Sequence, residues 1–568
     1  MLNLLNKRSP AFWIFLSLGF IIFTNQLHYF YQDEFENILG GRYLLSLRFP
    51  YADFFTHHNP GAFFLSGVIN ILSGESFVRF RILLGIVFLA SYITFYLYVK
   101  KRFGNLEAKL LLIFYFFITF GATFFWGHML LADSLSAYLL TPAYMICLLL
   151  ALKGEALTKK DIYIVSALTF STILTSLTQA YSCFLIYIFL TVWNFKFNTF
   201  KWRSFFLITL LPYLVFVIYL LVSRSIIEYF RQAIEFNAQY YVQLPDNVSP
   251  KNPLRVAVVF IVKFFENFKS AFLQVKDVSI GAPFIHALVL SNVSLMIYLG
   301  LKRKFYLLTF VFIFLAFINA RGNPYTTSET DYQAIVYHFI SIFNGLLAMY
   351  LLWKEANFTQ LPSKRFLLNA LILLLGIYQI ALFLLFVDKW QDKTYRKYMG
   401  TQALIYDRPT IAAALNDLIP KNEHYLIAPF DFENQIYMKS KPATKYIVIL
   451  PGMDKSERIQ SEVLADLKKN KPKILVFNTE LSIYQAYPGQ FLQNFIKEEY
   501  INLAAMGVPC NGFNTKQKWY GDYDFERHFF LDKSKKDTIW NQMLEKGYLY
   551  PISQEEVKKI PLCNPTPS

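Results

Sequence analysis

Eleven apolar stretches occupy the first two thirds of this 568-residue chain, and each is long enough to cross a lipid bilayer. A spanning helix needs about 17 to 25 mostly apolar residues. The composition agrees, because 55% of the residues are hydrophobic and only 17% are charged. The sequence therefore predicts an α-helical polytopic membrane protein, surrounded by membrane lipids, with spans near 10–28, 80–99, 108–126, 129–152, 161–178, 180–195, 204–223, 281–300, 304–320, 333–353 and 365–387.

Short clusters of lysine and arginine separate the apolar stretches and contribute much of the formal charge of +16. If the N-terminus is cytoplasmic, all these clusters, from Lys7-Arg8 to Lys364-Arg365, fall on the cytoplasmic side. This pattern is typical of a topology signal and argues against nucleic acid as a partner. We interpret the basic N-terminus and first apolar stretch as an uncleaved signal anchor, and we expect the C-terminal segment outside.

One apolar run, at 254–262, complicates the topology. Its length of about nine residues is too short to span, so we interpret it as interfacial. If it crossed the membrane, the later basic clusters would all face outward.

Two outer regions of the membrane domain, 1–388, follow from this topology. The first, 29–79, contains two predicted short juxtamembrane helices at 34–47 and 60–72. The second, 224–280, contains an amphipathic pattern that is typical of a helix lying in the interface.

The remaining segment, 389–568, has a soluble composition and forms the predicted second domain. Apolar runs at 425–428, 446–450 and 474–477 predict buried strands, and 456–469 predicts a helix. We therefore expect a small extracytoplasmic α/β domain. Cys510 and Cys563 lie within it, where an outside location permits a disulfide.

Three acidic residues at the outer ends of spans are the candidates for catalysis. Asp33 and Glu34 begin a juxtamembrane helix, and Asp133 lies at the outer end of the fourth span. A cap at a helix N-terminus is the alternative role for each of them. Carboxylates from two separate outer segments can instead converge on a pocket, where one accepts a proton and another orients a hydroxyl.

Cationic side chains are expected on the same face, where they can bind a phosphate through charge-assisted hydrogen bonds. Snorkelling to lipid headgroups or pairing with nearby acids is the alternative. For the adjacent histidines at 57 and 58, a polar pocket role is favoured over metal binding, since neighbouring rings do not easily point at one ion. The candidates are Arg79, Arg81, Arg321, His338, His57 and His58.

These residues lie in motifs that resemble a known family. Asp33-Glu34, Gly40-Gly41 and the run Pro50-Tyr-Ala-Asp-Phe-Phe-Thr-His-His-Asn-Pro-Gly61 resemble the first outer loop of GT-C glycosyltransferases. The nearest subgroup is the bacterial protein O-mannosyltransferase and aminoarabinose transferase group. The segment Leu131-Ala-Asp-Ser134 and the C-terminal run from Asn434 to Tyr446 agree with this resemblance.

The resemblance implies a plasma-membrane enzyme that transfers a sugar from a polyprenyl-phosphate donor to a glycan, lipid or protein acceptor outside, with inversion. It makes Asp33 the base or acceptor-orienting carboxylate, supported by Glu34 and Asp133. No cofactor is demanded, although some members of the superfamily use a divalent metal. Some relatives have a lysine before Pro60 that holds the donor phosphate; here the residue is Asn59, so another group must supply that charge.

Two other classes of protein fit parts of the pattern. A transporter or lipid flippase also has many spans, but it should carry charges near the midplane and paired half-repeats, which the sequence lacks. A polysaccharide ligase or polymerase predicts key basic residues in a large outer loop, and 224–280 provides Arg224, Arg231 and Lys251.

Overall fold

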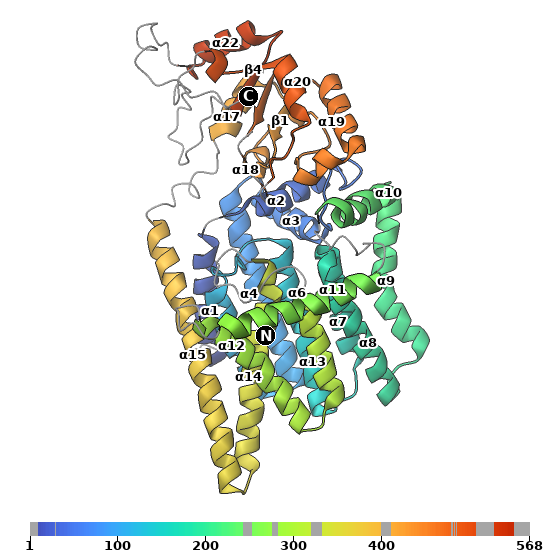
Figure 1. The fold of residues 1–568 in the computed structure, drawn as a ribbon, viewed down its shortest axis with the longest axis vertical. Coiled ribbons are helices and arrows are strands. Elements are labelled where there is room, and N and C mark those ends of the chain that lie inside the picture. The colour runs from blue at the N-terminus through green and yellow to red at the C-terminus, as the bar shows by residue number, and fades with distance from the viewer. Residues whose placement is uncertain are drawn as a thin grey trace.

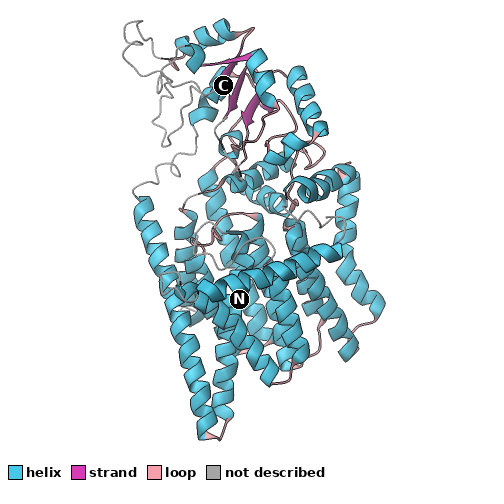
Figure 2. Cartoon of the chain, viewed as in Figure 1, coloured by secondary structure: helices cyan, strands magenta, loops and turns pink. Residues whose placement is uncertain are grey.

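The computed structural model describes residues 10–28, 30–241, 253–274, 282–319, 332–398, 410–478, 481, 483, 486–506 and 528–549. A long helical bundle makes up most of the molecule, and a smaller domain that contains the strands lies at one end of it (Figures 1 and 2). The two parts correspond to the apolar and the soluble portions of the sequence.

A helix of the bundle covers most of each of the eleven predicted spans. Within the described ranges, seven helical segments are long and apolar enough to cross a membrane, and further helices of 10–17 residues are also apolar. The predicted α-helical membrane class is therefore confirmed. The bundle helices are α1 (Pro10–Gln26), α4 (Phe77–Arg102), α5 (Asn105–Gly121), α6 (Ala132–Lys153), α7 (Lys159–Thr175), α8 (Ala180–Phe197), α9 (Trp202–Val222), α12 (Ala282–Leu301), α13 (Phe305–Ile318), α14 (Ile335–Phe358) and α15 (Pro362–Tyr398).

Basic clusters from several connections meet at one end of the bundle. Arg102 pairs with Asp161 at 3.1 Å, and Lys153 pairs with Glu107 at 2.9 Å. Lys304 donates to the Leu152 carbonyl at 3.2 Å, which brings a distant connection to the same end. The clusters at these positions thus share one face, as the topology signal predicts, and the outer-loop helices lie at the opposite end (Figure 1).

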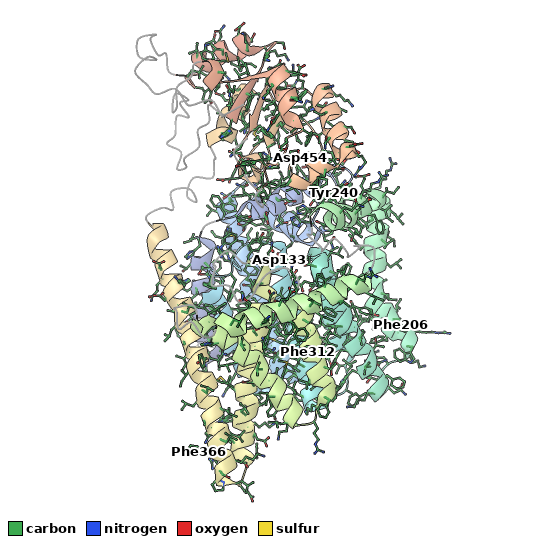
Figure 3. The ribbon with its side chains drawn as sticks, in the orientation of Figure 1. Asp133, Phe206, Tyr240, Phe312, Phe366 and Asp454 are labelled. Atoms are coloured by element: carbon green, nitrogen blue, oxygen red, sulfur yellow. The ribbon has the colours of Figure 1, made fainter. Side chains whose placement is uncertain are left out.

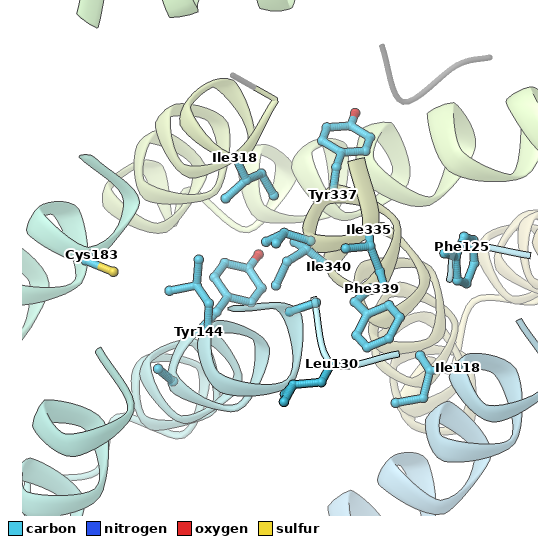
Figure 4. Packing of buried hydrophobic residues seen from close by; sticks show 14 of the residues in the cluster. Ile118, Phe125, Leu130, Tyr144, Cys183, Ile318, Ile335, Tyr337, Phe339 and Ile340 are labelled. Atoms are coloured by element: carbon cyan, nitrogen blue, oxygen red, sulfur yellow. The ribbon is translucent and has the colours of Figure 1, made fainter. Parts of the chain in front are cut away.

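Helix α14 lies inside the bundle, since every residue from Ile335 to Ala348 is buried, and large apolar side chains pack around it (Figure 4). A series of hydrogen-bonded polar side chains crosses this core. Tyr144 donates to Asn344 at 2.9 Å, and Asn344 donates to Asn292 at 2.9 Å. Since lipid offers no hydrogen bonds, these internal partners satisfy the polar groups and fix α6, α12 and α14 together.

Two short helices, α2 (Gln32–Leu45) and α3 (Gly61–Ser73), form the first outer region, within two residues of the predicted bounds. They pack closely at Gly41. A Cβ atom there would lie 2.6 Å from the backbone nitrogen of Gly67, so only glycine allows this approach. The close packing holds the acidic start of α2 rigidly above the bundle.

The second outer region is helical in its described part. It contains α10 (Ile226–Tyr229), the π-helix η2 (Phe230–Tyr241) and α11 (Pro253–Gln274). The apolar run at 254–262, which we interpreted as interfacial, lies in the first half of the 22-residue helix α11. Polar residues follow that run at helical spacing and continue the helix, which lies across the bundle rather than along it (Figure 1).

The C-terminal domain has a five-stranded mixed sheet in the order β2-β1-β3-β5-β4. β1 pairs with β2 and β3 in parallel, and β5 pairs with β3 and β4 in antiparallel register. The strands are β1 (His424–Ala428), β2 (Lys441–Pro442), β3 (Ile474–Phe477), β4 (Tyr500–Asn502) and β5 (Phe529–Asp532). The helical elements are α17 (Thr410–Leu418), α18 (Phe432–Gln435), η4 (Pro451–Lys455), α19 (Glu457–Lys469), α20 (Leu492–Glu499), η5 (Ala504–Met506) and α22 (Lys536–Glu545).

The predicted helix at 456–469 is confirmed, but the predicted strand at 446–450 is wrong. These residues are buried without regular structure. Tyr446 stacks on Phe55 of the first outer region at 5.3 Å, so its apolar character serves the contact between the domains. Helix α15 also continues to Tyr398, past the predicted boundary at 388. Cys510 and Cys563 lie outside the described residues.

Candidate active site

Asp33 lies in the first turn of α2, half-buried at the end of the bundle that contacts the C-terminal domain. The hydroxyl of Tyr332 donates a hydrogen bond to its Oδ2 atom at 3.1 Å. Tyr31 is the N-cap residue of the helix, and no side chain caps it, so Asp33 is not an N-cap. Its carboxylate lies near the positive end of the helix dipole.

Tyr332, the hydrogen-bond partner of this carboxylate, belongs to a group of three aromatic rings. Trp126 stacks on Tyr332 with centroids 5.2 Å apart and planes 8° from parallel. Tyr31 contacts both rings, at 4.9 Å and 5.7 Å. Trp126 has a φ of 60°, an uncommon conformation for a bulky residue that the surrounding structure must stabilise. The rings and Asp33 together form what we call the Asp33 site.

Glu34 is fully buried and contacts different partners from Asp33. Arg81 of α4 donates to its Oε2, and the Leu130 backbone N–H donates to its Oε1 at 3.2 Å. Burial raises the pKa of Glu34, whereas the Arg81 charge and the Leu130 hydrogen bond lower it. These partners make Glu34 an anchor between α2, α4 and the chain before α6.

Asp133 lies in the first turn of α6 and is 2% exposed. The N-cap residue of α6 is Leu131, and no side chain caps it, so Asp133 is not an N-cap either. The preceding segment is fixed to α2, because Asn37 donates to the Leu130 carbonyl at 2.7 Å. Figure 3 labels Asp133 on the bundle, and α6 packs against η3 (Tyr332–Ala334), the element that carries Tyr332 of the Asp33 site.

The predicted phosphate-binding cations occupy different environments. Arg79 is exposed at the start of α4, and Arg81 is buried against Glu34. His338 lies inside the bundle on α14, stacked on Phe125 at 5.0 Å, which is typical of a packed aromatic side chain. Arg321 lies outside the described residues.

His57 and His58 meet a third side chain, Glu36, in a cluster next to the Asp33 site. Their ring centroids are 3.9 Å apart, and His58 Nε2 lies 3.6 Å from Glu36 Oε2. Thr56 donates to Glu36 Oε1 at 3.1 Å. Burial raises the pKa of Glu36 to about 8, with a further upward contribution from Asp33 and an opposing one from Thr56.

The C-terminal domain touches the residue before Asp33. The Gln32 side-chain oxygen accepts hydrogen bonds from the backbone N–H groups of Phe432 and Glu433, at 2.9 and 3.1 Å. Arg42 of the same helix donates to the Ile436 carbonyl. The small domain is therefore docked directly onto the helix that carries Asp33.

Asn59 directly precedes Pro60 in the first outer region. Its amide donates to the Ile173 carbonyl of α7 at 2.6 Å, and the residue is 5% exposed. The side chain thus joins the outer loop to the bundle and carries no charge for a phosphate.

Sequence reasoning missed several members of these clusters. Glu36 lies three residues after Asp33, a spacing that puts both on one face of a helix, so this signal was available. Tyr332 and Trp126 gave no such signal, because the hydrogen bond of Tyr332 to Asp33 and its stacking on Trp126 join distant segments of the chain.

The fold and the Asp33 site define a polytopic helical membrane protein with an acidic, aromatic-lined site at one end of its bundle, beneath a small α/β domain. No family model matches the chain, and no curated protein matches it. Among solved structures, it is similar to the crystal structure of ArnT from Cupriavidus metallidurans bound to undecaprenyl phosphate. The two chains are 13% identical, the match covers 84% of this chain and 96% of that one, and the TM-score is 0.43.

Proposed function

We propose that this protein is a GT-C-type membrane glycosyltransferase that uses a polyprenyl-phosphate sugar as donor. The observation that carries the proposal is Asp33, a half-buried carboxylate in the first turn of α2, hydrogen-bonded to Tyr332 and bordered by aromatic rings. Carboxylates that accept protons and aromatic faces that pack on apolar ligand surfaces are features expected of a sugar-binding site. The resemblance of the surrounding loop to the GT-C family supports the same reading.

In the proposed reaction, Asp33 accepts the proton of an acceptor hydroxyl, whose oxygen forms a bond to the anomeric carbon. The bond from that carbon to the phosphate oxygen breaks, and polyprenyl phosphate leaves with the electron pair. Attack from the opposite face inverts the anomeric centre. Asp133, at the start of α6, is proposed to orient the acceptor. Glu34 is proposed to hold α2, and with it Asp33, in position.

Arg79 is our candidate for binding the donor phosphate. It lies two residues before Arg81 on α4 and is exposed at the outer end of the bundle, where a lipid phosphate can reach it. Arg81 is less suited to this role, because Glu34 already accepts from its guanidinium.

The distribution of ion pairs favours an enzyme over a transporter. Among the described residues, the Arg102, Lys153 and Lys302 pairs lie at one end of the bundle. The Glu34–Arg81 pair lies at the other. A transporter would be expected to place its charges near the midplane.

A reconstitution assay tests this proposal. The full-length protein is placed in liposomes with undecaprenyl phosphates that carry a radiolabelled hexose or pentose, together with an extract of envelope lipids and glycans. The expected result is movement of the label from the donor to an acceptor, with release of undecaprenyl phosphate. If no donor is consumed above the level of heat-inactivated protein, the proposal is wrong.

A further inference from the structure

A cluster of three metal-ligand side chains lies beside the Asp33 site and takes no part in the proposed transfer. Glu36, His57 and His58 each offer one ligand atom, and these atoms lie within 4.8 Å of one another. Glu36 is 2% exposed and His57 is 5% exposed, so the cluster is largely shielded from water. Buried carboxylate and imidazole groups at one point are the donor set that divalent metals select.

The donor set fits Zn²⁺ best. Zinc accepts imidazole nitrogens and carboxylate oxygens at about 2.0 to 2.2 Å, and tetrahedral geometry then separates the ligand atoms by about 3.3 Å. The cluster needs a closure of about 1.5 Å to reach this spacing, which side-chain rotations can supply. Three protein ligands leave one tetrahedral position for water or another oxygen ligand.

The backbone of the two histidines is held by neighbouring side chains. Tyr51 donates to the His58 carbonyl at 2.7 Å, and Asn237 of η2 donates to the His57 carbonyl at 2.6 Å. Neither histidine has a positive φ. The rings of adjacent residues therefore converge without left-handed backbone, which removes the objection that the sequence raised against this pair.

The carboxylate is also oriented by a partner outside the cluster. The Thr56 hydroxyl donates to Glu36 Oε1 and leaves Oε2 as the atom that faces His58. Outer hydrogen bonds of this kind fix the direction of ligating groups in metal sites. Gln232 of η2 in turn accepts from the Thr56 backbone N–H at 3.2 Å.

We propose that Glu36, His57 and His58 form a Zn²⁺ site that ties the first outer loop to α2, one turn from Asp33. The site stands apart from the transfer reaction, because Asp33 is not among its ligands. The alternative is a metal-free cluster in which a protonated His58 pairs with Glu36.

Zinc binding to the full-length protein distinguishes the zinc site from the metal-free cluster. The protein is purified in detergent with a tag that contains no histidine, stripped with a chelator, and titrated with Zn²⁺ alone. We expect one tightly held zinc per chain and a higher unfolding temperature. Zinc-edge X-ray absorption of the loaded wild type should show two imidazole ligands, and this measurement does not depend on any variant.

The variants locate the site. Glu36→Gln and His58→Asn should weaken zinc binding by more than about tenfold, and Thr56→Val, which keeps all three ligands, by about tenfold. His424→Gln, a histidine of the C-terminal domain, should bind zinc like the wild type. The proposal is overturned if the wild type retains no zinc, if Glu36→Gln and His58→Asn bind it unchanged, or if the absorption spectrum lacks two imidazoles. A protein that binds zinc but transfers no sugar would leave this site standing and refute only the proposed function.

Discussion

Arg81 of α4 donates to the carboxylate of Glu34 on α2 inside the protein, where the two side chains are 2% and 0% exposed. The pair was expected among the catalytic and phosphate-binding candidates, and its burial instead favours an anchoring role. It fixes the helix that carries Asp33 to the end of a bundle helix. Gln32, which contacts the C-terminal domain, lies on the same helix.

Breaking this pair should destabilise the protein. Arg81→Met leaves the Glu34 carboxylate buried without its partner, which costs about 3 to 5 kcal/mol. Adding Glu34→Gln removes the charge but keeps an acceptor for the Leu130 N–H, so the double variant should recover part of the loss. Thermal unfolding of the purified variants measures both effects. An Arg81→Met protein of normal stability that binds donor poorly would instead make Arg81 a phosphate ligand.

Gln32→Ala should loosen the contact between the two domains. The substitution leaves the N–H groups of Phe432 and Glu433 without their acceptor, at a cost of about 1 to 3 kcal/mol. Hydrogen exchange at 430–436 should become faster in the variant. Gln239→Ala, which removes an exposed amide of η2, is the matched control and should exchange like the wild type.

Glu433 should make stability depend on pH. Burial, followed by the neighbouring Asp431, raises its pKa from 4.5 to about 8. The folded state therefore binds the proton more tightly, and the free energy of unfolding falls as the pH rises from 4.5 towards 8. Glu433→Gln should reduce this slope in thermal unfolding scans, whereas Glu457→Gln, an exposed acid on α19, should not. An unchanged slope in Glu433→Gln would contradict the assignment.

The C-terminal domain should lie outside the cytoplasm. The basic clusters that meet at the far end of the bundle are expected to face the cytoplasm, and the domain docks at the opposite end. A reporter enzyme that is active only outside the cytoplasm, fused after Ser568, should therefore be active. A reporter active only in the cytoplasm should be silent there, and the reverse result would invert the topology.

The membrane helices were predictable because a span must satisfy its own hydrogen bonds and present apolar side chains to lipid. The two short outer helices were also predicted within two residues, since their apolar faces and flanking turns are local features. The local sequence pattern gave a wrong secondary structure where tertiary contacts, rather than neighbouring residues, determine the conformation. Tyr446–Leu450 is apolar because it packs against Phe55 and the sheet, and it forms no strand.

The site was only partly predictable for the same reason. Asp33, Glu34 and Asp133 were identified from their positions at span ends, which the sequence records. The partners that give Asp33 and Glu34 different roles lie far away in the sequence. Tyr332 is 299 residues from Asp33, and Arg81 is 47 residues from Glu34. Only Glu36, three residues from Asp33, gave a local signal that could have been used.

The transfer activity of Asp33→Asn tests the central claim most directly. The variant keeps the size of the side chain and an oxygen that can accept from Tyr332, but it cannot take a proton from an acceptor. In liposomes with a labelled undecaprenyl-phosphate sugar, transfer should fall by about 10² to 10⁴-fold, with unfolding temperature unchanged and Glu457→Gln fully active. Transfer by Asp33→Asn at the wild-type rate would contradict the assignment of Asp33 as the base.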